Sequence, residues 1–398
     1  MCEKKLVPKL RFSGFNDEWS INKLDEISSL TSSKRIYSSD YVETGIPFYR
    51  GAEITQLKNN EEIKEKLFIS TEKYNELKNK FGAPKKDDIL VTGVGTLGNV
   101  YKIRDNAEFY FKDGNLIWIK DITINPDFLE LYLETFKNEM LKLAIGSTQK
   151  ALTIVSLEKL KVKYPNIQEQ RKIANFFEVL DNKIRLLSEK YNYYIDFKKY
   201  LMQQIFAQKL RFDKQNEWKT VEIKSVVSEY KEKAGDNEYP ILSSTLSGIF
   251  LQSDYFDKNV NSSDTQDYKV VPKGFFTYRS MSDTGVFRFN IQNIVEKGII
   301  SPAYPVFTTE NINDMFLEQY LNNSPYIKRQ ILTLKEGGTR YALGFNKFKK
   351  LKIEVPSVNE QNKIADCFNT VDTKINHVDN ELKNINNFKK GLLQQMFV

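Results

Sequence analysis

The sequence predicts an α+β fold class: two similar domains, each closed by a long helix, arranged as an internal repeat with pseudo-two-fold character. The main observation is a duplication, because the segment from Gly146 to Phe206 returns at Gly337 to Phe397 with an offset of 191 and 24 identities in 61 positions. The second is a long helical apolar pattern inside both copies. The third is that the stretches between the copies mix strand-like and helix-like runs.

The opening segments of the two halves also resemble each other. PKLRFSGFNDEW ends at Trp19, and QKLRFDKQNEW ends at Trp218. The longer stretches that follow, about 20–145 and 219–336, show no convincing identity to each other. We therefore predict a first domain at 1–165, a central helix at 166–207, a second domain at 208–356 and a C-terminal helix at 357–398.

Each repeated segment carries an apolar stripe in alternating steps of four and three residues, which is typical of a coiled-coil seam. In the first copy the stripe is Ile173, Phe177, Leu180, Ile184, Leu187, Tyr191, Tyr194, Lys198, Leu201 and Ile205. In the second it is Ile364, Phe368, Val371, Ile375, Val378, Leu382, Ile385, Lys389, Leu392 and Met396. Both copies place a lysine at the same step. About 40 helical residues give a rod of about 60 Å. We predict an antiparallel pair within the chain that spaces the two domains, and a dimerisation coiled coil is the alternative.

The stretches between the repeats predict the elements of each domain. In the first, ILVTG, NVYKI, EFYF and NLIWI read as strands, and a helix is expected from Asp127 to Ala144 after Pro126. In the second, GFFTYRS, GVFRFN and NIVEKGII read as strands, and the corresponding helix runs from Met315 to Leu332. The shared order predicts two domains of one fold.

Gly93, Gly95 and Gly98 have the spacing of a dinucleotide-binding loop. Such a loop must open a helix, whose N-terminus holds the pyrophosphate. The residues after Gly98 alternate with period two, as a strand does, so we predict a hairpin that needs positive φ. The alternative is a turn whose amides, with the hydroxyls of Thr92 and Thr96, approach a phosphodiester. Asn125-Pro126-Asp127-Phe128 faintly resembles an adenine methyltransferase motif, but a helix start explains it better.

The composition limits the chemistry that the chain can perform. Lys and Arg number 59 against 52 Asp and Glu, a net charge of +7, which is compatible with nucleic-acid binding. Cys2 and Cys367 are the only cysteines and His377 the only histidine, which argues against a disulfide framework, a cysteine zinc site or a histidine triad. We expect no catalytic residue, metal or cofactor. No apolar run could span a membrane, so a cytoplasmic protein is expected.

With these motifs in hand, the chain resembles the specificity subunit of a bacterial Type I restriction-modification enzyme. The resemblance rests on PKLRF with Trp19, the Gly-Ser-Thr and Gly-Gly-Thr loops at Gly146 and Gly337, Pro-x-x-x-Glu-Gln-x-x-Ile-Ala from Pro165 and Pro356, and the Leu-x-Gln-Gln endings. It covers the whole chain. It implies two target-recognition domains that each read one half of a split double-stranded DNA site, with two unlike halves. It also implies no catalysis in this chain, which would recruit two adenine-N6 methyltransferase subunits and, through them, the restriction (motor-nuclease) subunits.

Candidate DNA contacts are polar residues beside short turns, because arginine can fork onto guanine while hydroxyls and amides suit phosphates. In the first domain these are Lys34, Arg35, Tyr49, Arg50, Thr92, Thr96, Asn99 and Arg104. In the second they are Ser243, Ser244, Tyr278, Arg279, Ser280, Arg288, Thr339, Arg340 and Tyr341.

Methyltransferase docking is expected on the outward helix faces and on two dyads, Glu169-Gln170 and Glu360-Gln361. The dyads are open to a second interpretation as plain helix-start contacts. For the whole chain, the main alternative function is a stand-alone bipartite DNA-binding regulator with no methyltransferase partner. A self-sufficient methyltransferase lacks its cofactor loop, and a purely structural scaffold leaves the divergence of the two domains unexplained.

Overall fold

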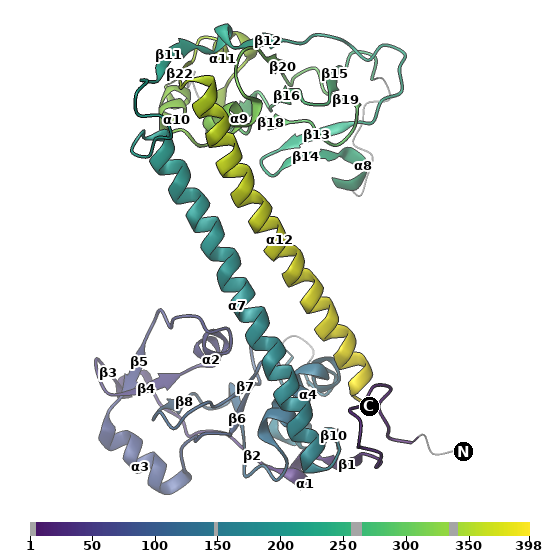
Figure 1. The fold of residues 1–398 in the computed structure, drawn as a ribbon. Helices are drawn as coiled ribbons and strands as arrows, with labels where there is room; N and C mark the ends of the chain where they lie inside the picture. The colour runs from purple at the N-terminus through teal and green to yellow at the C-terminus, as the bar shows by residue number, and fades with distance from the viewer. Residues whose placement is uncertain (1–4, 147–149, 256–264, 334–340) are drawn as a thin grey trace. The chain divides into compact units, whose positions relative to one another are not determined.

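The structure, a computed structural model, describes residues 5–146, 150–255, 265–333 and 341–398 (Figure 1). It divides into two compact units, residues 1–186 with 382–398, and residues 187–381. Two long helices, α7 (Ile167–Phe206) and α12 (Val358–Met396), each begin in one unit and end in the other. The predicted pair of long helices is therefore confirmed, although each helix is shared between units and is not a separate body.

The first unit contains a four-stranded antiparallel sheet in the order β2-β9-β6-β7. Its strands are β2 (Ser29–Thr31), β6 (Ile89–Thr92), β7 (Val100–Lys102) and β9 (Leu116–Lys120). A second sheet, β3-β5-β4-β8, contains β3 (Tyr41–Val42), β4 (Ile46–Tyr49), β5 (Leu67–Ile69) and β8 (Tyr110–Phe111). The strands predicted in this domain are all present.

The central strands are apolar because both faces of their sheet are covered. Ile89 and Val91 of β6 belong to one core cluster together with Phe128 of α4 (Pro126–Thr135). Leu90, the residue between them, belongs to another cluster with Ile54 of α2 (Gly51–Lys58). Successive strand residues point to opposite faces, so one short strand contributes to two cores.

The first unit also contains elements outside its two four-stranded sheets. They are β1 (Ser20–Lys23), α1 (Leu24–Ile27), η1 (Ser38–Asp40), α3 (Thr71–Phe81), α5 (Lys137–Lys142), α6 (Ile154–Glu158) and β10 (Lys161–Tyr164). Strand β1 pairs antiparallel with β10, directly before α7 begins.

The second unit repeats the first of the two four-stranded sheets of the first unit, whereas its other described strands form two-stranded sheets. Its four-stranded antiparallel sheet has the order β12-β20-β16-β18, which matches β2-β9-β6-β7 position by position. Its elements are β11 (Lys219–Glu222), η2 (Ile223–Ser225), β12 (Val227–Glu229), β13 (Leu242–Thr245), β14 (Gly248–Leu251), α8 (Gln252–Tyr255), β15 (Lys269–Pro272), β16 (Phe276–Thr277), β17 (Met281–Ser282), β18 (Asn290–Ile291), β19 (Lys297–Ile300), β20 (Val306–Thr309), α9 (Asp314–Asn323), α10 (Pro325–Leu332), β21 (Tyr341–Ala342), α11 (Phe345–Phe348) and β22 (Lys352–Val355). As β1 does with β10, β11 pairs with β22 before α12.

Two details of the predicted elements were wrong. The helix expected in each domain is two helices, α4 with α5 and α9 with α10. In the second domain Pro325 lacks an amide proton, and Ser324 caps a new helix there. The strand expected over GVFRFN is mostly irregular, and only β18 forms at its end.

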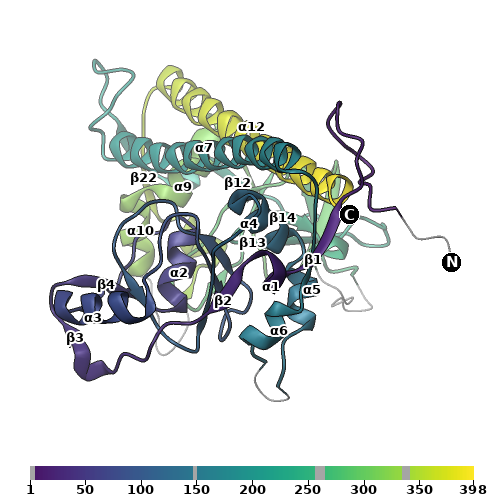
Figure 2. The same cartoon turned by 90° about the horizontal axis from the view of Figure 1, so that it is seen from below.

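Within each unit, the start of one long helix lies antiparallel to the end of the other, which Figure 2 shows for the first unit. Each lysine of the predicted seam forms an ion pair with an aspartate of the other long helix. Lys389 of α12 bonds Asp181 of α7, and its repeat counterpart Lys198 lies 2.5 Å from Asp372. The internal repeat therefore extends to individual ion pairs.

The aromatic residue at the end of each helix anchors it in a core. The ring of Phe397 lies 5.6 Å from Phe128, 5.9 Å from Trp19 and 6.4 Å from Phe177. Phe206, its counterpart, packs on Phe316 and other rings of the second unit. The end of each helix is thus part of the hydrophobic core of the unit in which it ends.

We predict that Phe397→Ala destabilises the first unit by about 3 kcal/mol or more, because a truncated buried phenylalanine leaves a cavity. Urea unfolding followed by tryptophan fluorescence measures the change. The matched control is Phe388→Ala in α12, whose ring is 55% exposed, and it should stay within about 0.5 kcal/mol of the parent. Equal stabilities of the two variants would contradict this anchoring role.

Candidate nucleic-acid interface

Four loops of the first domain meet at one edge of its sheets. The amide of Gly93 donates to the carbonyl of Asn115 over 2.8 Å, and the amide of Lys112 donates to the carbonyl of Tyr49 over 2.9 Å. The hydroxyl of Ser32 donates to the carbonyl of Leu116 over 3.0 Å. The structure therefore brings together candidates that are far apart in sequence. We define the first loop cluster as residues 32–35, 49–51, 93–99 and 112–115.

The glycine-rich stretch is a hairpin loop between β6 and β7, as predicted, with Gly95 at φ +80° and Gly98 at φ +70°. The Thr92 hydroxyl donates to the carbonyl of Thr96 and accepts from the amide of Asn99 over 2.8 Å. Thr92 is buried, and the two bonds of its hydroxyl hold the loop in shape. Of the two predicted threonines, only Thr96 is exposed.

Gly98 allows the loop to pack closely on α5. A Cβ at this position would lie 3.0 Å from Met140 Cε and 3.2 Å from Leu141 Cδ2. The positive φ and the close approach both favour glycine at this position. These glycines therefore serve the packing of a hairpin on a helix.

A lysine that the sequence did not single out completes this cluster. The buried Asn99 amide donates to Thr55 Oγ1 over 3.0 Å, and its oxygen accepts from Lys137 Nζ over 2.8 Å. Burial, together with the nearby charge of Lys58, lowers the pKa of Lys137. Lys137 was missed because a lysine in a helical pattern usually marks a solvated face, and no signal in the sequence distinguishes it.

Two arginines of the cluster are held by carboxylates, whereas Lys34 Nζ lies 4.7 Å from the centroid of the Phe81 ring. Lys34 and Arg35 are exposed, and Arg35 Nε lies 3.3 Å from Asp113 Oδ2. Arg50 is partly exposed and binds Glu53 at 2.5 Å, and Tyr49 is partly buried. Surface pairs of this kind exchange partners at small cost, so the cations of Lys34 and Arg35 remain available to a phosphate.

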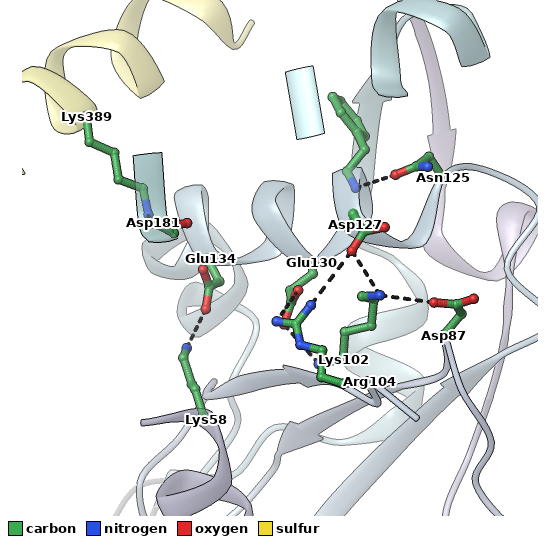
Figure 3. Close-up of polar contacts among 11 residues, drawn as sticks. Lys58, Asp87, Lys102, Arg104, Asn125, Asp127, Glu130, Glu134, Asp181 and Lys389 are labelled. Atoms are coloured by element: carbon green, nitrogen blue, oxygen red, sulfur yellow. Dashed lines mark hydrogen bonds and ion pairs between the residues drawn. The ribbon is translucent and has the colours of Figure 1, made fainter. Parts of the chain in front are cut away.

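Arg104 lies apart from the cluster, at the opposite end of β7. Its guanidinium binds Glu130 at 2.9 Å and lies 3.7 Å from Asp127, beside a buried Lys102 that bridges Asp87 and Asp127 (Figure 3). Burial raises the pKa of Glu130, and Arg104 partly offsets this. Arg104 thus pairs with a buried carboxylate outside the first loop cluster, in an exposed loop position, and its role as a DNA contact stays a prediction.

The second domain has a corresponding cluster. The amide of Leu343 donates to the carbonyl of Ser280 over 2.8 Å, as that of Leu152 donates to Gly93 over 2.9 Å. We define the second loop cluster as residues 243–248, 279–288 and 341–342. Arg279 is exposed and has no ion pair or hydrogen bond within the residues that the structure describes. Ser243, Ser280, Arg288 and Tyr341 are partly exposed.

Two candidates of the second domain are core residues. Tyr278 is fully buried, its hydroxyl donates to the carbonyl of Leu343 over 3.0 Å, and burial raises its pKa. The Ser244 hydroxyl accepts from Asn290 Nδ2 over 2.9 Å inside the domain. Both are unavailable to DNA in this conformation. Thr339 and Arg340 lie outside the described residues.

The glutamates at the helix starts are internal. Glu169 accepts two bonds from Arg11, at 2.8 and 2.7 Å, and Glu360 accepts two from Arg211, both at 2.8 Å. Both glutamates are buried. A partner could reach them only by breaking these pairs, so the structure favours the helix-start interpretation over docking.

The neighbouring glutamines are equally occupied. Gln170 accepts from the amide of Asn125 over 2.8 Å and donates to the carbonyl of Pro165 over 2.7 Å. Gln361 makes the same two bonds with Asn313 and Pro356, at 2.9 and 3.0 Å. Each dyad therefore joins the start of a long helix to the opening segment and to the first helix after the sheet.

Among the described residues, no group of histidine, cysteine and carboxylate side chains could hold a metal ion. No helix in the described part of the chain is long and apolar enough to cross a membrane.

The described residues thus form two copies of one four-stranded sheet, each with its own loop cluster and each followed by an equivalent long helix. A family model, the Type I restriction modification DNA specificity domain, matches residues 16–193 and again 215–387. The chain belongs to this family.

Related proteins agree with this assignment. The chain is 33% identical over 168 residues to a protein of Haemophilus influenzae described as a type I restriction enzyme specificity subunit, and 26% identical over 222 residues to the MjaVIII specificity subunit of Methanocaldococcus jannaschii. The matches cover 41% and 52% of this chain, and 41% and 50% of those relatives. The chain therefore spans about half the length of the curated relatives it matches, or less.

Solved structures support the fold. The type I restriction-modification S subunit from M. genitalium has a TM-score of 0.60 at 16% identity, over 98% of this chain and 99% of that one. A chain from a study of complex assembly and conformational transition in the type I R-M system has a TM-score of 0.55 at 14% identity, over 95% and 97%.

We predict that Glu360→Gln lowers the free energy of unfolding by about 3 kcal/mol at pH 7, because it leaves Arg211 without its buried partner. Burial raises the pKa of Glu360, but hydrogen bonds from Arg211 and from the amides of Asp213 and Phe212 outweigh it and leave the pKa below 4.5. The stabilisation by the Arg211–Glu360 pair is then complete above pH 4.5. It is lost as the pH falls through the lower pKa that Glu360 has in the folded state. The deficit of the variant should therefore shrink below about pH 4, as urea unfolding at several pH values will measure.

The matched control for this prediction is Glu296→Gln, also in the second unit, whose side chain is 85% exposed and pairs with Lys273. Its effect should stay within about 0.5 kcal/mol at every pH. A Glu360→Gln deficit that is equally small, or one that persists unchanged at low pH, would contradict the role of the buried pair.

Proposed function

We propose that this chain is the DNA-recognition subunit of a Type I restriction-modification complex. Each domain reads one half of a bipartite, asymmetric site in double-stranded DNA. The chain itself performs no catalysis and needs no cofactor. It recruits two adenine-N6 methyltransferase subunits and, with them, the restriction subunits, in the cytoplasm where the DNA is accessible.

The observation that carries this proposal is a contrast between two parts of each domain. The frame, which we define as the four-stranded sheet and the long helices, is repeated, whereas the loop clusters differ. The two sheets share one strand order, and the two helix starts share one set of buried bonds. The first loop cluster contains a glycine hairpin loop packed on α5, whereas the second contains a longer loop between β16 and β18, which includes β17 and lies beside the hairpin β13–β14. Two domains with the same frame but different loop clusters are suited to a DNA site whose two halves differ in sequence.

The proposed DNA contacts are the candidates that the structure leaves exposed or partly exposed in the loop clusters. They are Lys34, Arg35, Tyr49, Arg50, Thr96, Ser243, Arg279, Ser280, Arg288 and Tyr341, joined by Lys137. For the methyltransferase subunits we propose the outward faces of the long helices. Their exposed apolar side chains, such as Val179 at 68% and Tyr193 at 64%, support this assignment.

The test is base-modification sequencing of the host genome with and without this gene. We expect N6-methyladenine to disappear from one split motif with unlike halves when the gene is removed. An unchanged methylome, combined with tight binding of one DNA site by the purified chain alone, would instead favour the stand-alone regulator.

We further predict that Arg279→Ala weakens DNA binding of the assembled complex and reduces the slope of log K against log salt by about 0.9, because one phosphate contact is lost. Fluorescence anisotropy across a salt series measures this slope. If Arg279 reads a base, the loss is confined to the specific site and the slope stays unchanged.

The control for this experiment is Lys224→Ala, which removes a 64%-exposed cation of the same unit outside the second loop cluster. It should change neither affinity nor slope. Equal behaviour of both variants would remove Arg279 from the interface.

A further inference from the structure

A cleft of about 420 Å³ opens in the second domain beside the second loop cluster. The tip of the β13–β14 hairpin, the loop before β18 and helices α9 and α10 surround it. Its lining consists of Leu246, Thr284, Gly285, Val286, Phe287, Arg288, Leu321, Asn322, Lys328, Ile331 and Leu332.

The rim of the cleft is apolar and faces water. Leu246 is 65% exposed, Val286 is 56% exposed and Leu332 is 54% exposed. They come from three different segments, so their convergence is a property of the fold and not of one apolar run. Grouped exposed apolar side chains on a soluble domain usually mark a binding surface.

The same cleft carries cationic donors. Lys328 is exposed, and Arg288 is partly exposed. Arg288 Nε is buried and has no hydrogen-bond partner among the described residues. An unpaired buried donor is costly, so this atom would gain from an acceptor that enters the cleft. The charge of Arg288 also acts on the carboxylate of Glu318, where it partly offsets the burial that raises the pKa of that group.

In the first domain the described residues at the equivalent place are packed together. There the β6–β7 loop closes on α5, and Gly98 lies directly against Met140 and Leu141. In the second domain the loop before β18 stands away from α10, and the space between them stays open. The cleft therefore belongs to the part that differs between the domains, which is where specificity must reside.

We propose that this cleft reads a thymine in the major groove, an inference that rests on the proposed function. Thymine presents an O4 acceptor next to a C5-methyl group, a combination that no other DNA base offers there. The guanidinium of Arg288 donates to O4, while Leu246, Val286 and Leu332 receive the methyl group. Cytosine presents an N4 donor instead, which meets the Arg288 donors unfavourably. Lys328 pairs with an adjacent phosphate.

The test uses the complete complex and the methylated split motif. Each thymine of the motif is replaced in turn by deoxyuridine, which lacks only the methyl group. We expect one position, in one half, to lower affinity about fourfold, the value of one buried methyl group. In Val286→Thr and Leu246→Asn, which change exposed side chains, this fourfold difference should vanish. The control Ile294→Thr, at an apolar residue that is 46% exposed and outside the cleft, should keep it.

The outcomes separate this inference from the function on which it rests. A motif without thymine, or thymines insensitive to the replacement, would overturn it. A methyl effect that survives in both Val286→Thr and Leu246→Asn would also overturn it. Variants that weaken binding to thymine and uracil sites equally would do the same, because the cleft would then hold something other than the methyl group. Absence of any split methylated motif would instead overturn the proposed function itself.

Discussion

The buried arginine–glutamate pair at the start of each long helix is the interaction on which the rest of the structure depends. Arg11 with Glu169 and Arg211 with Glu360 join the opening segment of each half to its helix, and the adjacent glutamine joins that helix to α4 or α9. A buried pair adds little net stability compared with apolar packing, but its geometry is exacting and its removal is costly. It therefore specifies one position of the helix on each domain.

This constraint allows a division between a fixed frame and variable loops. The frame is repeated down to single bonds, including the lysine–aspartate pairs of the helices and the aromatic anchors Phe206 and Phe397. The loops at the sheet edges repeat the backbone bonds donated by Leu152 and Leu343, but their lengths differ. They can differ in length and chemistry between the domains without disturbing the helices, which suits a protein that reads two unlike half-sites.

Most of the frame could be predicted from the sequence, because a duplication and a 3.5-residue apolar period are one-dimensional signals. The lysine in both seams was visible, but its aspartate partners were not, since they lie on the other helix. The loop surface was less predictable. Tyr278 sits beside a turn, as a DNA contact would, yet it fills the core, and Lys137 and Thr55 reach Asn99 only through tertiary structure. Burial and long-range contacts decide these roles, and neither is written in local sequence.

The most direct test of this account is an exchange of one domain's variable part. Residues 224–350 would be replaced by the equivalent segment of a family member with a different sequence there, leaving both long helices and the first domain intact, and the methylated motif would be determined. The account predicts that one half of the motif changes while the other half and the distance between the halves stay the same. A change in both halves, or an unchanged motif, would contradict the claim that each domain reads its own half from a common frame.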